Sequence, residues 1–316
     1  MDKLKLLLNK GITSFISSGW KYLNAKTKGL PHTIMIEPTQ KCNLNCTICY
    51  TQKCPNKRNQ DFMSFGQFKK IIDEIEYHTV YINFWFAGEP LLNKDLGGMV
   101  EYANRKDIIT CVSTNATLLN EHIAKELITA KLDKLIISFD GATKETYEKI
   151  RVGANFDNVK ENIKRMTSMK KDRPFVTLQL VVTKENEHEL DKFEQLAKDL
   201  NADGAYLKSL YTFDPGDKEI KDKIKSLVPS KPFQRSKERF CTADFRSVIL
   251  SDGRVIPCCM DVEQTHVFGN VFDKSFEEIW NSKKYKYFRK DQTRFYKDPL
   301  CKSCGCNKDY TIKKLK

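Results

Sequence analysis

The sequence predicts an α/β fold, in which a partial (β/α)6 TIM-like barrel precedes a small C-terminal module with a β-hairpin and a helix. Short apolar runs alternate with helical segments six times between residues 33 and 207. This alternation is typical of a parallel sheet with right-handed crossovers. Six repeats are too few for a closed eight-stranded barrel. After residue 240 cysteines cluster around a hairpin turn signal, which indicates a second module.

Six apolar runs bounded by turn residues are expected to form the strands. They are residues 33–37, 80–86, 108–113, 134–139, 175–182 and 204–207. The intervening segments have helical periodicity, and the first is introduced by Ser64 and Gln67 at capping-box spacing. We expect a single long helix from Gly141 to about Met169.

The remaining segments define the expected domain boundaries. Residues 1–31 alternate lysines with large apolar residues, which predicts an amphipathic helix that packs on the protein or lies on an anionic membrane surface. Residues 32–209 form the barrel, and residues 210–240, rich in proline, lysine and aspartate, form a linker. Residues 241–316 form the second module.

Local signals also define the second module. Asp252-Gly253 predicts the turn of its hairpin. Ser275 and Glu278 form another capping box, from which one helix is expected to run through Tyr287.

Composition limits the function classes. The chain of 316 residues has 11 cysteines, and their clustering indicates metal binding rather than a disulfide framework. A reducing cytoplasm suits such thiols. The net charge of +13 is spread along the chain without a basic block or an RNA-binding signature, so no nucleic-acid partner is expected. No apolar run is long enough for a transmembrane helix, and no signal peptide is evident.

Three cysteines lie in one loop after the first predicted strand. Cys42, Cys46 and Cys49 are spaced as CxxxCxxC. Three thiolates can hold three irons of a cubane [4Fe–4S] cluster and leave the fourth iron open for chemistry. A zinc site is the main alternative, but it usually has four cysteine or histidine ligands, and no histidine lies near this loop.

This loop, followed by the aromatic Tyr50, resembles the signature of the radical S-adenosylmethionine (SAM) superfamily. The resemblance implies that Cys42, Cys46 and Cys49 bind a cluster whose open iron chelates SAM. It also implies that Tyr50 packs against the adenine. In that family the reduced cluster cleaves SAM, and the resulting 5′-deoxyadenosyl radical abstracts hydrogen from the substrate.

A second stretch resembles the GGEP motif of the same family, whose backbone binds the SAM amino group. It consists of Ala87, Gly88, Glu89 and Pro90, with alanine in place of the first glycine. Glycine allows close approach of the backbone to a ligand. Without the resemblance, a Gly-Glu-Pro turn is nearly uninformative.

Further SAM contacts are implied at other strand ends. By resemblance, Ser138 meets the ribose, and Arg151 pairs with the SAM carboxylate through its bidentate guanidinium. Ser113, Thr114 and Asn115 end the third predicted strand and are expected to line the same pocket. The structural alternatives are a strand-end turn and a surface arginine.

The C-terminal cysteines resemble the SPASM/twitch extension of radical SAM enzymes, which binds auxiliary [4Fe–4S] clusters. The match implies that one auxiliary cluster is bound by Cys241, Cys258, Cys301 and Cys304. Four protein ligands leave no open iron, so this cluster is expected to carry electrons. A zinc hairpin is the alternative.

Four further cysteines lie outside these two sets. Cys259 and Cys306 lie close enough in sequence to replace Cys258 or Cys304 as ligands. Cys54 and Cys111 are candidate hydrogen donors if the reaction is an epimerisation, and are otherwise a free thiol and a core residue.

The expected function is a radical SAM oxidation or epimerisation of a sugar-like or other small molecule, with the auxiliary cluster as electron acceptor. Only 32 residues precede Thr33, where the first strand starts, which leaves no room for an N-terminal peptide-recognition domain. The basic charge suits an anionic substrate. A flavodoxin- or ferredoxin-type protein is expected as electron donor. A peptide-modifying (RiPP maturation) enzyme and a non-catalytic zinc-binding scaffold are the alternatives.

Overall fold

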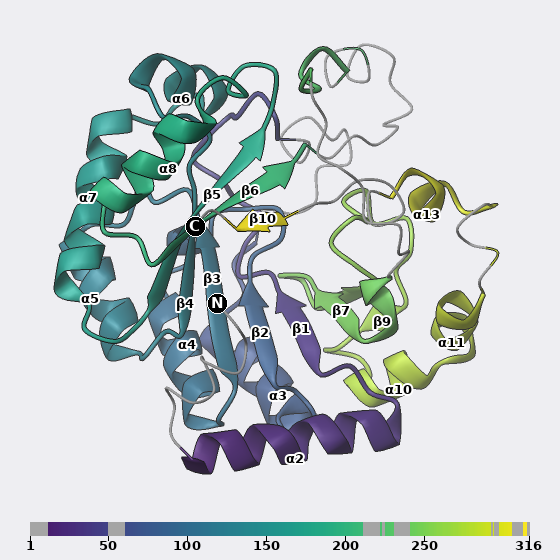
Figure 1. The fold of residues 1–316 in the computed structure, drawn as a ribbon. Coiled ribbons are helices and arrows are strands. Elements are labelled where there is room, and N and C mark those ends of the chain that lie inside the picture. The colour runs from purple at the N-terminus through teal and green to yellow at the C-terminus, as the bar shows by residue number, and fades with distance from the viewer. Residues whose placement is uncertain are drawn as a thin grey trace.

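The computed structural model of this chain describes residues 12–49, 61–210, 222, 225–230, 241–291, 293, 297–304 and 312–314. Within these residues one sheet has the strand order β10-β6-β5-β4-β3-β2-β1-β7-β8-β9 (Figure 1). The six strands expected for the barrel are present and parallel: β1 (Thr33–Ile36), β2 (Tyr81–Phe84), β3 (Ile109–Thr114), β4 (Lys134–Ser138), β5 (Phe175–Val182) and β6 (Gly204–Ser209). This open parallel sheet confirms the predicted partial barrel.

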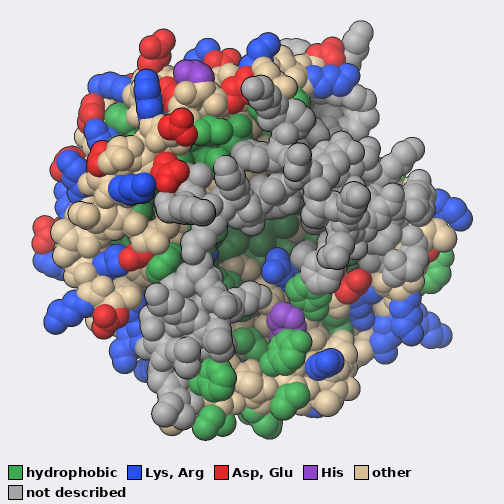
Figure 2. All heavy atoms as spheres, in the orientation of Figure 1, with side chains coloured by type: hydrophobic (Ala, Val, Ile, Leu, Met, Phe, Trp, Pro, Cys, Tyr) green, Lys and Arg blue, Asp and Glu red, His purple; other side chains and the backbone are tan. Residues whose placement is uncertain are grey.

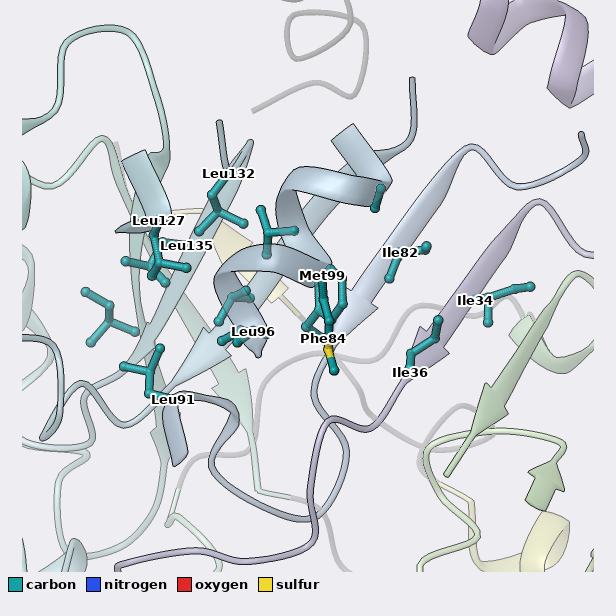
Figure 3. Close-up of a cluster of buried hydrophobic side chains, with 14 of the residues drawn as sticks. Ile34, Ile36, Ile82, Phe84, Leu91, Leu96, Met99, Leu127, Leu132 and Leu135 are labelled. Atoms are coloured by element: carbon teal, nitrogen blue, oxygen red, sulfur yellow. The ribbon is translucent and has the colours of Figure 1, made fainter. Parts of the chain in front are cut away.

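One face of the sheet carries the main hydrophobic core beneath the crossover helices. The helices are α3 (Phe65–Ile75), α4 (Leu96–Arg105), α5 (Glu121–Thr129), α6 (Lys144–Ile150), α7 (Phe156–Met169) and α8 (Leu190–Asp199), with a short 3₁₀ turn, η1 (Pro90–Leu92). Figure 3 shows Ile36 of β1 and Phe84 of β2 directed toward this layer, where Met99 of α4 lies. Burial of these large side chains is the main stabilising term for such a layered fold.

The opposite face of the barrel strands is more polar. Successive side chains of a strand point to opposite faces, and the positions that alternate with the core residues include Asn83, Cys111, Ser113, Ser138 and Lys208 besides apolar ones such as Ile136. Because the parallel strands all end at the same edge, the loops that follow them meet there. This face and this edge are therefore where the fold can place a site.

Two predicted helices are interrupted. The long helix expected after Gly141 is two helices, α6 and α7, because Gly153 has a φ of +95° and Asn155 caps α7 by accepting a hydrogen bond from the Asn158 amide. The helix expected through Tyr287 is also divided. α10 (Phe276–Asn281) is followed by α11 (Lys283–Lys290), and the extended residue Ser282 caps the second helix.

Other local predictions are confirmed. Both capping boxes are present, at Ser64 before α3 and at Ser275 before α10. β7 (Arg246–Ile249) and β8 (Arg254–Ile256) form the expected hairpin, and Gly253 in its turn has a φ of +84°. β9 (Gly269–Asn270) pairs with β8.

The C-terminal module is joined to the barrel in a way that the sequence did not predict. β7 pairs in parallel with β1, so the hairpin extends the barrel sheet instead of forming a separate one. The chain also contains η2 (Thr242–Asp244) and α13 (Pro299–Ser303), and β10 (Ile312–Lys314) pairs antiparallel with β6. The domain boundaries stay predictions, and most of the expected linker lies outside the described residues.

The N-terminal helix α2 (Ile12–Lys28) lies across the end of the sheet where the strands begin (Figure 1). It carries the amphipathic pattern expected for the N-terminal segment. Among the described residues, no helix combines the length and apolar character needed to cross a bilayer.

The Glu37 side chain, just after β1, forms hydrogen bonds that join three segments of the chain. This side chain is fully buried, and one carboxylate oxygen accepts a hydrogen bond from the Ala87 amide at 3.3 Å. The other oxygen accepts from the amide and the hydroxyl of Ser251 at 3.1 and 3.2 Å. One carboxylate therefore links β1 to the loop after β2 and to the β7–β8 hairpin.

Replacing this carboxylate is expected to destabilise the junction. Glu37→Ala leaves the Ala87 and Ser251 amides buried without their acceptor, which should lower the free energy of unfolding by about 2 kcal/mol. Urea denaturation followed by circular dichroism measures this change. Glu121→Ala, which removes an exposed glutamate of α5, is the matched control and should leave the midpoint almost unchanged. Equal midpoints for the two variants would contradict the role given to Glu37.

Candidate functional site

The loop that carries Cys42, Cys46 and Cys49 follows β1 and has no regular secondary structure. Its backbone is held from one side by the last residue of α6 and the loop that follows it. The Asn45 amide donates to the Val152 carbonyl and the Thr47 amide to the Ile150 carbonyl, both at 2.9 Å. These bonds satisfy buried backbone groups that the loop cannot pair internally.

The same loop is held from the other side by the loops after β2 and β3. Asn43 donates to the Thr117 hydroxyl at 2.8 Å and accepts from the Asn115 side chain at 3.0 Å. The Glu89 amide donates to the Lys41 carbonyl at 2.8 Å. Sequence reasoning placed Asn115 here but missed Asn43, because a single asparagine between cysteines has no distinguishing pattern.

The three thiols of this loop interact with one another. Cys46 is buried, and Cys42 and Cys49 are half-buried. Burial raises the pKa of Cys42 and raises that of Cys46 to about 11, and the charges of the neighbouring cysteines add to both shifts. In the part of the chain that the structure describes, no three Cys, His, Asp or Glu side chains converge closely enough to hold one metal ion. Three neighbouring thiols are the donor set of a cluster in which each thiolate binds a different iron.

Arg151 lies beside these thiols and is paired with Asp140. Its Nε donates to Asp140 Oδ2 at 2.6 Å, its Nη2 contacts the same oxygen, and its Nη1 donates to Cys46 Sγ at 3.8 Å. Burial alone would lower the pKa of Arg151, but the Asp140 carboxylate raises it. The guanidinium is therefore a fixed positive charge next to Cys46.

Asp140 is a site residue that sequence reasoning treated only as the end of a strand. It is fully buried at the C-terminal end of β4, and its Oδ1 accepts the Val181 amide at 2.7 Å. The pairing of Arg151 with SAM stays a prediction, and in this structure two of the arginine's donors contact Asp140 instead.

The Ala87–Pro90 stretch packs against the start of the cysteine loop. A Cβ atom on Gly88 would lie 2.3 Å from the Thr39 carbonyl oxygen and 2.5 Å from that of Lys41. The position therefore requires glycine for the loop to approach. The sequence motif predicted a close approach to a ligand, and the approach seen here is to the backbone of the cysteine loop, so the contact with SAM stays a prediction.

Glu89 is a positioning residue in this arrangement. Its carboxylate accepts hydrogen bonds from the Thr114 hydroxyl at 2.6 Å and the Asn115 amide at 2.7 Å, and it caps η1. Burial raises the pKa of this carboxyl, an effect that these hydrogen bonds partly offset. Glu89 therefore ties the loop after β2 to the end of β3.

The structure describes some, but not all, of the remaining residues that were predicted to contact SAM or substrate. Ser113 and Ser138 lie on the polar face of the sheet near the ends of β3 and β4. Cys111 lies deeper on the same face, is fully buried and shares a hydrogen bond with Tyr81, and burial raises its pKa to about 11. Their roles stay predictions. The predictions for Tyr50, Cys54 and Cys306 fall outside the described residues.

The four proposed auxiliary ligands belong to the C-terminal module. Cys301 is buried, and Cys241, Cys258 and Cys304 are half-buried. Burial raises the pKa of Cys258 well above its usual value, and the charges of Cys259 and Cys241 contribute. Their donor chemistry suits a thiolate-bound cluster. Cys259 itself is exposed, and its charge reaches Lys208 on the polar face of the barrel.

A chain of hydrogen bonds connects the two halves of this cysteine set. Asp261, close after Cys258, accepts the His266 amide at 3.0 Å, and His266 Nε2 lies 2.8 Å from Asp298 Oδ2. The other oxygen of Asp298 accepts the amides of Leu300 and Cys301 at the start of α13. Sequence reasoning gave His266 no role, because nothing in its neighbourhood along the chain reveals this contact.

Comparison with known proteins gives two family matches. Residues 36–197 match the model of the radical SAM superfamily, and residues 241–305 match the SPASM iron–sulfur cluster-binding domain.

Individual relatives cover most of the chain. A tungsten-containing aldehyde ferredoxin oxidoreductase cofactor-modifying protein of Pyrococcus furiosus is 26% identical over 86% of each chain. The antilisterial bacteriocin subtilosin biosynthesis protein AlbA of Bacillus subtilis is 24% identical over 89% of this chain and 67% of its own. The structure of Streptococcus suis SuiB bound to the precursor peptide SuiA superposes with a TM-score of 0.67 at 16% identity, covering 90% of this chain and 72% of SuiB.

A larger residue in place of Gly88 is expected to displace the cysteine loop. In Gly88→Ala the added methyl group collides with two carbonyl oxygens, so iron bound by the first cysteine set and SAM cleavage should both fall, the latter by roughly tenfold to a hundredfold. The measurements are iron content and 5′-deoxyadenosine formation after anaerobic reconstitution.

Gly98→Ala is the control for this substitution. In α4 the nearest atom to the new methyl group would be 3.6 Å away, so this variant should keep its activity and gain helix stability. Full activity of Gly88→Ala would show that the loop does not need this approach.

Removing Asp298 is expected to affect only the auxiliary cysteines. Asp298→Ala loses both the cap of α13 and the contact with His266, so Cys301 is no longer held against the Cys258 loop. Iron per chain should fall from about eight to about four atoms, while reductive SAM cleavage persists. Asp273→Ala, at an exposed aspartate of the same module, should keep all its iron. Loss of SAM cleavage in Asp298→Ala would contradict the separation of the two sets.

Proposed function

Because this chain belongs to the radical SAM superfamily and carries a SPASM domain, we propose that it is a peptide-modifying enzyme that abstracts hydrogen from a peptide carbon. The matches to both family models confirm the resemblance found in the sequence and its cofactors, SAM and iron–sulfur clusters. The chain is thus a radical SAM enzyme. The substrate and the individual residue roles are our proposals.

The observation that carries the chemistry is the loop with Cys42, Cys46 and Cys49, held at the C-terminal edge of the sheet by neighbouring loops. The three thiolates would hold the cluster, which would supply the electron for the reductive cleavage of SAM. Arg151 places a positive charge beside Cys46. Glu89 and Asn43 keep the loop against the ends of β2 and β3.

The substrate is proposed to bind over the polar face of the sheet. Ser113 and Ser138 lie there near the predicted SAM site, and Lys208 of β6 is on the same face. Burial lowers the pKa of Lys208, and the charge of Asp140 opposes that shift. This cation would suit a carboxylate of the substrate. The C-terminal cysteines would hold the cluster that accepts the electron left after hydrogen abstraction.

The relatives support a peptide substrate over the sugar or other small molecule that the sequence favoured. The Bacillus subtilis relative takes part in bacteriocin biosynthesis, and the Streptococcus suis structure contains a precursor peptide. The argument for a small molecule depended on the short N-terminal segment, which does not bear on how a peptide is recruited. Cofactor modification is the second candidate function, because the Pyrococcus furiosus cofactor-modifying protein matches this chain over most of the length of both chains.

Deuterium transfer distinguishes these substrate classes. The reconstituted enzyme is reduced in the presence of SAM and either a pool of deuterated short peptides or a deuterated nucleotide sugar. If a peptide is the substrate, deuterium appears in 5′-deoxyadenosine, and the peptide changes mass. The signal should be absent in the triple variant Cys42→Ala/Cys46→Ala/Cys49→Ala and present in Gly98→Ala, the control substitution on α4. Deuterium transfer from the sugar alone would overturn the peptide proposal but leave the enzyme class intact.

A further inference from the structure

The N-terminal helix α2 packs against the protein with its small and polar side inward. Ser14, Ser18, Lys21 and Ala25 recur at helical spacing, and all four are buried. Ser14 donates to Asp107 at 2.6 Å, and the Lys21 ammonium donates to the Lys106 carbonyl. Polar contacts thus fix this helix to the body of the protein.

The outward side of α2 is apolar. Ile16, Trp20 and Leu23 form one stripe at helical spacing, with exposed fractions of 65%, 55% and 61%. Phe15 and Tyr22 flank this stripe and are also exposed. A surface helix normally has the opposite arrangement, with its apolar side toward the core. We call these five side chains the α2 stripe. Figure 2 shows hydrophobic side chains along the lower edge of the molecule, over α2.

The charges around the α2 stripe are mainly positive. α2 has no acidic residue, and its last turn carries the exposed Lys26 and Lys28. The hollow beside its first turns is lined by three cationic side chains, Arg105, Lys131 and Arg173, and two acidic ones, Glu101 and Asp107. Two of these cations lie beside carboxylates, Arg105 beside Glu101 at 4.0 Å and Arg173 beside Asp133 at 3.1 Å, so the excess of positive charge comes from Lys131 and the lysines of α2. The chain as a whole carries +13.

We propose that α2 docks this enzyme on an anionic membrane surface. An exposed apolar stripe that includes tryptophan, bordered by lysines, is the pattern of a helix that lies in the interface between lipid headgroups and acyl chains. The apolar side chains enter the boundary, and the lysines contact lipid phosphates. A second copy of the chain is a poorer partner for the α2 stripe, because such a dimer would bring two positively charged surfaces together.

The location of α2 is compatible with catalysis at the membrane. It lies at the end of the sheet where the strands begin, whereas the cysteine loop follows β1 at the opposite end (Figure 1). Docking through α2 therefore leaves the site facing away from the bilayer. This proposal does not depend on the identity of the substrate.

Vesicle flotation of the full chain tests the proposal. The expected result is binding to vesicles of phosphatidylcholine and phosphatidylglycerol, weaker binding at high salt, and little binding to phosphatidylcholine alone. The variant Ile16→Ser/Trp20→Ser/Leu23→Ser should bind at least about tenfold more weakly. Tyr287→Ser removes an aromatic side chain that is 72% exposed on α11 and should bind like the natural chain.

Tryptophan fluorescence gives an independent readout. Of the three tryptophans, Trp280 is fully buried, and the half-buried Trp85 follows β2 at the end of the sheet away from α2, so a blue shift on adding anionic vesicles should disappear in Trp20→Phe. Thermal stability and SAM cleavage should be unchanged in the triple variant, because the replaced side chains are exposed. The proposal is overturned if the natural chain does not float with anionic vesicles, or if the triple variant floats equally well. It is also overturned if the triple change abolishes self-association instead of vesicle binding.

Discussion

The backbone of the cysteine loop cannot satisfy its own hydrogen bonds, and the site depends on how neighbouring loops do so. The segment from Lys41 to Thr47 has no helix or strand, so its buried amides and carbonyls need partners elsewhere. They find them in the loops after β2 and α6, while the Asn43 side chain binds the loop after β3. These loops meet because parallel strands end at one edge. The positions of the three thiols are therefore a consequence of sheet topology.

Burial and the charge of Arg151 have opposite effects on the pKa of Cys46 in the cysteine loop. Burial disfavours thiolates and holds the pKa of Cys46 at about 11, so without iron this thiol keeps its proton at neutral pH. Arg151 opposes the effect of burial, and it can do so because Asp140 fixes its orientation. Binding of iron displaces the thiol protons, which couples cluster insertion to deprotonation. The neighbouring guanidinium favours the charged form that the metal needs.

The sequence predicted what depends on local pattern. The six strands, both capping boxes and the turn at Gly253 were found because hydrophobic period and turn residues specify them within a few positions. Gly153 and Asn155 signal the break between α6 and α7 in the sequence. The break was missed because apolar residues continue at helical spacing on both sides of it. Glu37 and Asn43 could not be found, because a lone polar residue carries no signal of distant contacts. The partners of Glu37 lie 50 and 214 residues away, and those of Asn43 lie 72 and 74 residues away.

The pairing of β7 with β1 determines how the two cysteine sets are related. A module attached only through residues 210–240 could take many orientations relative to the barrel. Here the register of Thr33 with Arg246 continues along four residue pairs, and Glu37 adds hydrogen bonds at the end of the ladder. The hairpin that leads to Cys258 is therefore part of the barrel sheet. Any change that shifts β7 against β1 should move the C-terminal cysteines relative to the first set without altering either set internally.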